Sequence, residues 1–520
     1  MARTMRLIDF FDRGARLNPH GPCLSDATRS LTYADTRALT CRIGQGLMGQ
    51  GLQPRMAAAV LSHNDVDAFA CILGILRAGL AWMPLNARNS LDDNLYILDS
   101  NACTWLFYHS AFTREAEAIR QGVPAIRGFV CVDQANGPDP WLYDWLAAWP
   151  SDDPDVPAGP HDLAAIWPSG GTTGRSKGVM LTNLNFTTMI ANFCASMHYE
   201  KPPVHLVAAP MTHAAGCIAL PTLALGGSQI MIPKVDPLEI MRHIELHRVT
   251  TLFLPPTAIY AMLAHPRVRE FDYSSLRHFI YAAAPMSSEK LKEAIDVFGP
   301  VMAQTYGQAE SPMLCTFLSP QEHQVDGNPV HEQRLASCGR ATLLTQVAIM
   351  DDDGRLRDAG DRGEIVIRGN LVMKGYVNNP AATEEASRFG WHHTGDIGLM
   401  DSDGYVYIVD RKRDMIISGG FNIYPSEIEQ VLWAHPDVQD CAVIGVPDDK
   451  WGEAVKAVVE LKPGATTAPQ DLLDFCRARL GGMKTPKSAE IWPELPRSPV
   501  GKVLKRDIRE RFWAGQARRV

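Results

Sequence analysis

The chain has 520 residues, a length that allows two to four domains and excludes a peptide-like binder. Of these residues 46% are hydrophobic and 21% are charged, as in folded globular proteins, so neither a disordered chain nor a fibre is expected. Its formal net charge of -8 offers no broad basic surface, and we expect neither nucleic acid nor an anionic membrane as a partner. The eleven cysteines are scattered and form no C-x-x-C pair, which favours reduced thiols in a cytoplasmic protein and argues against structural zinc.

The N-terminal part of the chain has the pattern of a layered α/β domain. Asp9 and Asp12 stand where a signal peptide needs an unbroken apolar stretch, so we expect no export signal. Residues 5–130 alternate helical periods with short apolar runs, which predicts a doubly wound sheet. Residues 132–162 are rich in Pro and Asp and predict a surface connector that is a poor place for chemistry.

A second α/β region is expected from residue 163 to about 335. Its strand-like runs LVAAP, SQIMIP, TLFLPP and HFIYAAAP each lead toward a turn or a helix. Residues 202–233 carry no Asp, Glu, Lys or Arg, yet prolines and glycines interrupt them, whereas a membrane-spanning helix needs about 20 largely continuous apolar residues. We therefore expect buried elements around an apolar pocket, and no membrane span.

The C-terminal part of the chain has a different sequence pattern. Between about 340 and 410, Asp-Gly pairs stand between alternating apolar residues, which predicts antiparallel hairpins and a small β-barrel. After Arg411 the succession of strands and helices predicts a compact α+β module. The predicted fold is therefore α/β: a large N-terminal domain over 1–411, with two doubly wound α/β subdomains and the small antiparallel barrel, and a smaller α+β domain over 412–520.

The most informative segment is WPSGGTTGRSKG, which runs from Trp167 to Gly178. Its four glycines let backbone N–H groups approach an anion, its two threonines add hydroxyl donors, and Lys177 adds a positive charge. The loop differs from a Walker A loop, in which a Ser or Thr follows the lysine, because Ser176 precedes Lys177. We expect it to hold phosphates, and a flexible Gly/Thr turn is the alternative.

Four further segments follow this loop along the chain: YGQAE at 306–310, TGD at 394–396, DRKRD at 410–414 and PVGKV at 499–503. With the loop, they resemble the motifs of the adenylate-forming superfamily of acyl- and aryl-CoA synthetases, carrier-protein adenylation domains and luciferases, and the chain is most like an acyl-CoA synthetase. The resemblance implies two steps. A carboxylate attacks the α-phosphate of ATP to give an acyl adenylate and pyrophosphate, and a thiol then attacks the carbonyl and releases AMP. ATP, Mg²⁺ and coenzyme A are the implied cofactors.

The resemblance also implies where the charged groups of the reaction lie. Thr172, Thr173 and Lys177 would grip the β- and γ-phosphates. Glu310 would hold Mg²⁺, since this hard cation suits carboxylate and phosphate oxygens together. Lys502 would be the catalytic cation between the substrate carboxylate and the α-phosphate, although a Gly-Lys pair near a C-terminus is otherwise most often an exposed turn.

The nucleoside is expected to contact residues from several motifs. Tyr306 would stack on adenine, with Ala284 and Pro285 on its other face. Asp396 and the neighbouring Arg411 would bind the ribose hydroxyls, since a carboxylate and a guanidinium together offer acceptors and donors. The remaining residues expected at ATP or AMP are Ser169, Gly170, Gly171, Gly174, Thr305 and Gly307.

A rotating C-terminal domain is a further implication of the resemblance. Its hinge would be Arg413, a linker position that absorbs a large φ/ψ change. Rotation would withdraw Lys502 and bring up Gly419, Gly420 and Phe421, where the glycines would let the pantetheine of coenzyme A pass close to the backbone. An ordinary hairpin turn is the alternative for the glycine pair.

An acyl pocket is expected around His213, Ala214 and Gly216 and around Ala282 and Ala283. The family often has His or an aromatic residue at the position of His213, as a catalytic gate between the acyl site and the thiol tunnel. A lone His in an apolar stretch is otherwise usually a satisfied core residue. The small side chains indicate room for a bulky or long apolar acid.

Three residues depart from the family pattern. Ala309 stands where the family usually has a Thr at the α-phosphate, Gly170 replaces a loop Ser or Thr, and Ser176 replaces a common Pro. Loss of the first hydroxyl would slow adenylation by ~10 to 100-fold unless Thr305 or backbone N–H groups replace it.

The leading hypothesis is an ATP- and Mg²⁺-dependent acid:CoA ligase acting on a hydrophobic carboxylic acid, whether fatty, aryl or alicyclic. One alternative loads the phosphopantetheine of a separate carrier protein. Another is a non-catalytic nucleotide-binding homologue, with Ala309 as a sign of decay, but the presence of every expected charged site residue argues against it. An amino acid substrate is not favoured, because 202–233 offers no acidic group for an ammonium. A homodimer would fit this size, but no sequence feature argues for one.

Overall fold

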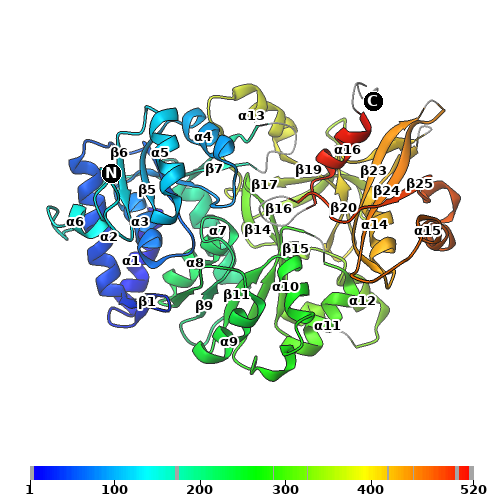
Figure 1. The fold of residues 1–520 in the computed structure, drawn as a ribbon, viewed down its shortest axis with the longest axis horizontal. Coiled ribbons are helices and arrows are strands. Elements are labelled where there is room, and N and C mark those ends of the chain that lie inside the picture. The colour runs from blue at the N-terminus through cyan, green and yellow to red at the C-terminus, as the bar shows by residue number, and fades with distance from the viewer. Residues whose placement is uncertain are drawn as a thin grey trace. The chain divides into compact units, whose positions relative to one another are not determined.

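Figure 1 shows the fold in a computed structural model of the chain. The structure describes residues 5–169, 175–284, 286–324, 326–418, 421–448, 450–497 and 503–513. The chain divides into two compact units, one comprising Met1–Val347 and Ile367–His392 and the other Ala348–Val366 and His393–Val520. This division differs from the predicted boundary after residue 411, which stays a prediction.

The first unit contains a seven-stranded sheet. Its strands are β3 (Ala57–Leu61), β4 (Ala81–Pro84), β5 (Cys103–Tyr108), β6 (Gly128–Cys131), β7 (Leu163–Pro168), β8 (Gly178–Thr182) and β18 (Gly375–Tyr376), in the order β18-β8-β7-β4-β3-β5-β6. The strands from β7 to β6 in this order run parallel, and β8 and β18 add antiparallel pairs at one edge. Strand β3 reads AAAVL and is buried throughout, as is typical of a parallel strand covered on both faces.

Helices accompany this sheet. They are α1 (Leu7–Leu17), α2 (Tyr33–Gly49), α3 (Val66–Arg77), α4 (Leu91–Ser100), α5 (Thr113–Gly122), α6 (Leu142–Leu146) and α7 (Asn183–Ser196), with a short 3₁₀ helix at Ser110–Phe112. Of these, α3 to α6 connect its parallel strands. Local sequence fixes where several of them begin. The side chains of Thr32, Asp65 and Ser90 accept backbone N–H groups at the starts of α2, α3 and α4. The predicted doubly wound layer is confirmed.

A nine-stranded sheet is the second sheet of the first unit. Its strands are β1 (Pro22–Ser25), β2 (Ser30–Thr32), β9 (Val204–Val207), β10 (Ser228–Met231), β11 (Thr251–Leu254), β12 (His278–Tyr281), β13 (Met302–Gln308), β14 (Ser311–Leu318) and β15 (Arg340–Ala341), in the order β15-β14-β13-β12-β11-β9-β10-β1-β2. Its helices are α8 (Ala214–Ala224), α9 (Pro237–His247), α10 (Pro256–Leu263), α11 (Ser288–Phe298) and α12 (Pro329–Arg334), with 3₁₀ helices at Val268–Glu270 and Pro320–His323. Strands β9, β10, β11, β12 and β13 run parallel to one another, which confirms the second α/β region.

The first hairpin of the chain belongs to this second sheet. Strand β1 pairs with β10 in parallel and with β2 in antiparallel orientation. Residues 5–130 therefore supply both sheets, whereas the sequence pattern assigned them to a single layer. A hairpin's own residues do not say which sheet edge it will join, because either edge offers the same backbone hydrogen bonds.

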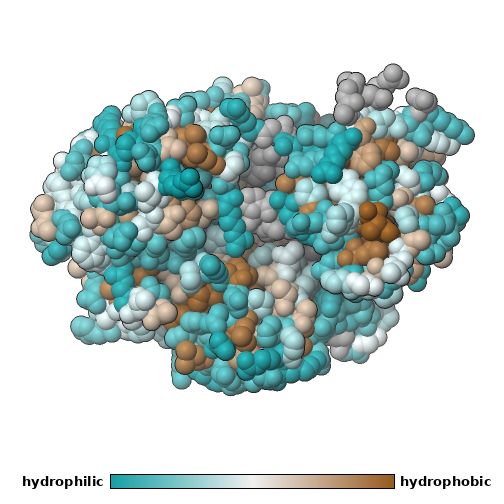
Figure 2. Space-filling model, in the orientation of Figure 1, coloured by the Kyte–Doolittle hydropathy of each residue, from teal (hydrophilic) through white to brown (hydrophobic). Residues whose placement is uncertain are grey.

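Residues 202–233 form strands β9 and β10 and the buried helix α8 between them. Among the described residues, no helix is long and apolar enough to cross a membrane. On the face drawn in Figure 2, hydrophilic residues predominate and hydrophobic ones are scattered among them.

The remaining elements follow β15. Strands β16 (Gln346–Met350), β17 (Arg362–Arg368), β19 (His392–Met400) and β20 (Val406–Arg411) form a four-stranded sheet in that order, and its closure into the predicted barrel stays a prediction. Helix α13 (Pro380–Ala386) and a 3₁₀ helix at Arg388–Gly390 lie between β18 and β19.

The C-terminal sheet contains β21 (Ile416–Ser418), β22 (Phe421–Ile423), β23 (Val438–Asp448), β24 (Gly452–Leu461) and β25 (Ser488–Ile491), with helices α14 (Pro425–Trp433), α15 (Pro469–Lys484) and α16 (Lys505–Trp513). This is the α+β module that the sequence predicts.

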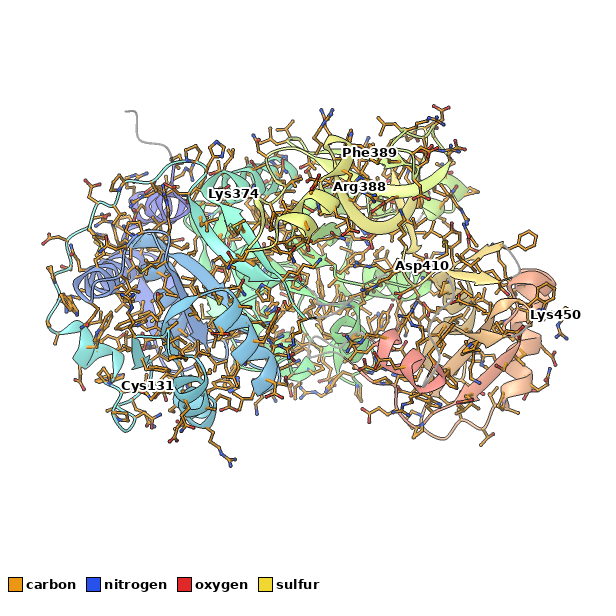
Figure 3. All side chains as sticks on the ribbon, turned by 90° about the horizontal axis from the view of Figure 1, so that it is seen from above. Cys131, Lys374, Arg388, Phe389, Asp410 and Lys450 are labelled. Atoms are coloured by element: carbon orange, nitrogen blue, oxygen red, sulfur yellow. The ribbon has the colours of Figure 1, made fainter. Side chains whose placement is uncertain are left out.

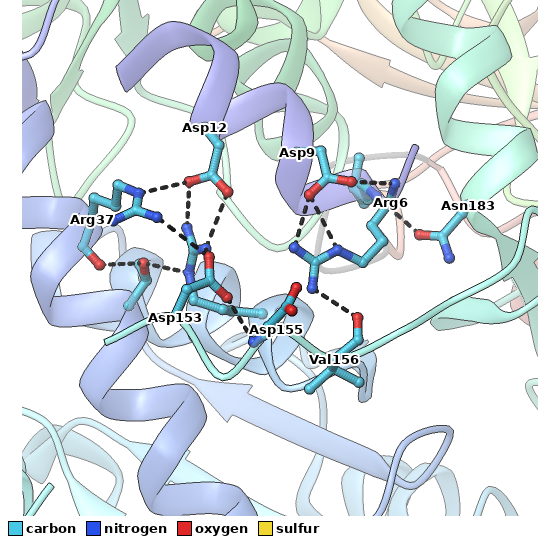
Figure 4. A network of polar contacts seen from close by, with 11 residues as sticks. Arg6, Asp9, Asp12, Arg37, Asp153, Asp155, Val156 and Asn183 are labelled. Carbon is cyan, nitrogen blue, oxygen red and sulfur yellow. Dashed lines mark hydrogen bonds and ion pairs between the residues drawn. The ribbon is translucent and has the colours of Figure 1, made fainter. Parts of the chain in front are cut away.

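A buried ion-pair network holds the Pro- and Asp-rich connector against the first layer (Figure 4). Arg77 of α3 is fully buried, and its guanidinium donates two hydrogen bonds to Asp12 of α1, at 3.1 and 2.6 Å. It also donates to Asp153 of the connector at 2.7 Å and to Thr40 of α2 at 3.0 Å. Residues 132–162 are thus a fixed part of the first unit rather than a simple surface excursion.

Three buried histidines predict that the fold loses stability in mild acid. Burial lowers the pKa of His205, His278 and His323 to about 4, from a usual 6.5. The unfolded chain therefore binds more protons between these values, so this stabilisation is complete above pH 6.5 and falls as the pH drops toward 4, by up to about 3 kcal/mol per histidine. We expect the urea midpoint to be level above pH 7 and to fall between pH 6.5 and 5.

Two variants test whether the buried histidines cause this fall of the urea midpoint. His205→Gln should reduce the fall of the urea midpoint between pH 6.5 and 5, because glutamine does not titrate. His20→Gln, at an exposed position, should leave it unchanged. An equal slope in the His205 variant would contradict the assignment.

Candidate functional site

Nine predicted site residues lie outside the described residues. They are Gly170, Gly171, Thr172, Thr173, Gly174, Pro285, Gly419, Gly420 and Lys502. Their roles stay predictions.

The predicted phosphate loop connects two antiparallel strands, β7 and β8. At its base the Ser169 N–H donates to the Lys177 carbonyl at 2.8 Å, and the Lys177 N–H donates to the Ser169 hydroxyl oxygen at 2.9 Å. The Ser176 hydroxyl donates to the Ser169 carbonyl at 2.8 Å. A Cβ at Gly178 would lie 1.7 Å from Asn101 Oδ1, so a larger residue there would have to displace the Asn101 side chain. The serines therefore close the loop, and Ser176 fills a structural role where the family commonly has Pro.

Lys177 and Glu310 meet at Tyr376, a residue that the sequence analysis missed. The Lys177 Nζ lies 4.7 Å from the centroid of the Tyr376 ring, and the Tyr376 hydroxyl donates a 2.8 Å hydrogen bond to Glu310 Oε1. Burial, together with the Glu310 carboxylate, raises the pKa of Tyr376 above its usual range, so the phenol keeps its proton and remains a donor. The only local signal is an aromatic residue after glycine in VMKGYV, and nothing in that run indicates a partner 66 residues away.

The expected adenine platform lies on β13 and in the turn after β12. Tyr306 is 8% exposed, and a Cβ at Gly307 would lie 2.6 Å from the Met313 backbone N, so glycine is required there. Ala283 has a φ of +76°, a left-handed conformation that non-glycine residues rarely adopt and that often marks functional sites. Ala284 beside it is half-buried.

Thr305 and Tyr306 are neighbours on one strand, so their side chains point to opposite faces of the sheet. The Thr305 hydroxyl is buried and has no hydrogen-bond partner in the described part of the chain. A nucleotide stacked on Tyr306 would lie away from it. The expectation that Thr305 replaces the missing hydroxyl of Ala309 stays a prediction, and this geometry does not favour it.

Asp396 and Arg411 lie directly opposite each other on β19 and β20. The Arg411 Nε lies 2.7 Å from Asp396 Oδ1, and the Asp396 side chain is only 3% exposed while that of Arg411 is 41% exposed. The Asp396 N–H donates to the Thr394 hydroxyl oxygen, and the Thr394 hydroxyl donates to the Ile365 carbonyl. The sheet thus presents a held carboxylate and a more accessible guanidinium side by side, as ribose binding would need.

The predicted hinge, Arg413, lies in the turn between β20 and β21, and burial lowers the pKa of its guanidinium. Contacts join the chain before this turn to helix α14 after it. The Ser426 N–H donates to Asp410 Oδ2 at 2.8 Å, and Arg362 forms a 2.7 Å ion pair with Glu427. Figure 3 labels Asp410 at the end of β20. Rotation about Arg413 stays a prediction, and in this arrangement it would have to break these contacts.

The predicted thiol-side residues flank a hairpin. Strands β21 and β22 pair in antiparallel orientation, with Ser418 opposite Phe421, and the Phe421 side chain is 54% exposed. The flanking strands therefore agree with the alternative of a hairpin turn, and such a turn is compatible with a role for its glycines at pantetheine. That role stays a prediction.

The expected acyl-pocket residues lie at the start of helix α8 and after β12. His213 precedes α8, its Nδ1 lies 3.1 Å from the Thr212 hydroxyl oxygen, and burial lowers its pKa to about 4. The imidazole is therefore neutral near pH 7 and can donate or accept a hydrogen bond but adds no charge. A Cβ at Gly216 would lie 1.9 Å from the Met211 carbonyl, so only glycine permits this close turn. Ala214 is half-buried.

Comparisons with known proteins find a matching family, similar sequences and similar folds. The family described as AMP-binding enzyme matches residues 11–377, and the AMP-binding enzyme C-terminal domain matches residues 427–502. A feruloyl-CoA synthase from an Amycolatopsis species is 36% identical over 506 residues, which cover 96% of this chain and 98% of that one. The medium/long-chain-fatty-acid–CoA ligase FadD8 of Mycobacterium tuberculosis is 35% identical, over 92% of this chain and 85% of its own. The structure of the amide bond synthetase McbA from Marinactinospora thermotolerans has a TM-score of 0.88 at 27% identity, covering 97% of this chain and 100% of that one.

Proposed function

Because the chain belongs to the AMP-binding enzyme family, we propose that it joins a hydrophobic carboxylic acid to coenzyme A through an acyl adenylate, with ATP and Mg²⁺. The observation that carries this proposal is that Lys177 and Glu310 both contact Tyr376, so that the proposed cation for phosphate and the proposed carboxylate for metal lie close together. The names of the relatives support coenzyme A as the acceptor and a fatty or aryl acid as the substrate.

The residues around Glu310 fit Mg²⁺ better than a metal held by protein alone. Among the described residues, no group of three or more His, Cys, Asp or Glu side chains could enclose a metal ion. Mg²⁺ usually takes one or two carboxylates and completes its shell with substrate phosphates and water. Glu310 has one oxygen bound by Tyr376 and offers the other. When bound, Mg²⁺ would neutralise phosphate charge.

Each remaining site residue has a task in the proposed reaction. Lys177 attracts the β- and γ-phosphates, Asp396 and Arg411 bind the ribose hydroxyls, and Lys502 stabilises the charge that develops as the carboxylate attacks. His213, whose lowered pKa leaves the ring neutral near pH 7, gates the path of the thiol in this proposal and adds no charge that would pair with the substrate carboxylate. The domain over 412–520 rotates about Arg413 between the two steps.

The acid substrate is proposed to be apolar and bulky. Ala214, Gly216, Ala282 and Ala283 have little side-chain volume, and none adds a charge that would pair with an ammonium group. An aryl acid such as ferulate and a medium or long fatty acid are the two classes that the relatives' names support.

The test measures AMP release and product formation with ATP and Mg²⁺ over a panel of ferulate, dodecanoate, an alicyclic acid and several amino acids. We expect acyl-CoA and AMP to accumulate only with coenzyme A and one apolar class, and pyrophosphate–ATP exchange to require the acid alone. Transfer only to carrier-protein phosphopantetheine would support the first alternative, and ATP binding without AMP formation on any acid would support the second. Since McbA is an amide bond synthetase, an amine arm is included, and amide in place of thioester would overturn the choice of acceptor.

A further inference from the structure

We propose that Tyr376 is a positioning residue that sets the spacing of Lys177 and Glu310 for one Mg²⁺–nucleotide. The inference rests on the proposed function, because it takes Lys177 as the phosphate cation and Glu310 as the metal carboxylate. It adds a residue from outside the recognised motifs to the machinery of the first step.

The backbone around Tyr376 connects the two motifs directly. The Met373 N–H donates to the Glu310 carbonyl at 2.7 Å, and the Val377 N–H donates to the Gly178 carbonyl at 2.8 Å. Between them the Lys374 N–H donates to the Met180 carbonyl at 2.9 Å, and Lys374 is labelled in Figure 3. Residues 373–377 therefore join the turn that carries Glu310 to the strand that leaves the phosphate loop.

The backbone at Tyr376 is itself held in place. Its N–H donates to the Thr383 hydroxyl oxygen of α13 at 2.9 Å. Gly375 has a φ of +143°, and a Cβ there would lie 2.8 Å from Thr383 Cγ2, so only glycine allows this approach. A buried ring on a backbone fixed from both sides has little freedom to follow a moving partner.

The two parts of the Tyr376 side chain serve different partners. The ring face attracts the Lys177 ammonium, and the hydroxyl occupies one oxygen of Glu310. A lysine and a glutamate placed side by side would pair and neutralise each other. With the ring between them, neither forms an ion pair with any residue that the structure describes, so each charge remains available, one for phosphate and one for metal.

Two substitutions separate these contributions. Tyr376→Phe keeps the ring under Lys177 but removes the donor to Glu310, whereas Tyr376→Leu removes both. For Tyr376→Phe we expect ATP affinity in EDTA to be unchanged and the Mg²⁺ concentration for half-maximal ATP binding to rise about 10-fold, as a lost charge-assisted hydrogen bond predicts. For Tyr376→Leu, ATP affinity in EDTA should also fall several-fold. Both are measured by titration calorimetry.

The matched control is Tyr108→Phe, because the Tyr108 hydroxyl donates to the buried Asp139 carboxylate at 2.7 Å, on β5. Tyr108→Phe should leave the ATP affinity in EDTA and the Mg²⁺ requirement unchanged. It also shows what the loss of a buried hydroxyl alone does to folding. Combining Tyr376→Phe with Glu310→Gln should raise the Mg²⁺ requirement no further than Glu310→Gln does alone.

Three results would overturn the inference. Two concern Tyr376→Phe: an unchanged Mg²⁺ requirement, or an equal loss of ATP affinity with and without Mg²⁺. The third is a Mg²⁺ requirement in the double variant that exceeds that of Glu310→Gln alone. If the unmodified protein binds ATP without any response to Mg²⁺, the proposed function fails first. If it responds to Mg²⁺ and Tyr376→Phe responds equally, only the role of Tyr376 fails.

Discussion

Replacing Lys502 by Ala is expected to lower the rate of acyl-adenylate formation by about 10²–10³-fold while ATP binding persists. A positioned cation stabilises the charge that develops on the attacking carboxylate and the α-phosphate, and removal of one such group typically costs this much. Calorimetric ATP affinity should change little, because Lys177, Asp396 and Arg411 would still hold the nucleotide. Acid-dependent pyrophosphate release gives the rate.

Lys462→Ala provides the matched control, since Lys462 is an exposed lysine of the same C-terminal module. It should keep the full rate. Thioester formation from a supplied acyl adenylate should survive Lys502→Ala, because Lys502 would be withdrawn in the second step. Normal turnover of the Lys502 variant would refute the proposed mechanism, and loss of both steps would refute the assignment of Lys502 to adenylation alone.

Replacing Arg77 by Ala is expected to lower the free energy of unfolding by about 3–5 kcal/mol. The Arg77 side chain has no exposed surface, and it pairs with Asp12 at 2.6 Å and Asp153 at 2.7 Å. Its removal leaves two carboxylates without their main cation in a place that water reaches poorly. Urea unfolding, followed by circular dichroism, gives the change.

Arg37→Ala tests whether burial causes this effect. Arg37 approaches the same two carboxylates, Asp12 and Asp153, at 3.4 Å, but its side chain is 43% exposed. Because solvent screens an exposed pair, the loss should stay within about 1 kcal/mol. Equal losses for both variants would contradict the account, as would a stable Arg77 variant.

The sequence alone determined the family, the α/β class and the order of the motifs. Five short segments, from WPSGGTTGRSKG to PVGKV, indicated the adenylate-forming superfamily, and the matched family and its relatives confirm it. The alternation of buried strands and helices predicted both α/β layers, and the structure confirms them. Such features could be predicted because glycine loops, caps and apolar periods are local consequences of neighbouring residues.

The tertiary structure alone decided which distant residues meet. Tyr376 reaches Glu310 across 66 residues, the connector's Asp153 reaches Arg77 across 76, and the first hairpin joins the second sheet. None of these has a local signal, since a tyrosine, an aspartate or a short strand accepts many partners and the three-dimensional packing of the sheets selects one. The sequence therefore predicted the charged residues of the proposed site, and only the fold shows that Tyr376 contacts two of them, Lys177 and Glu310.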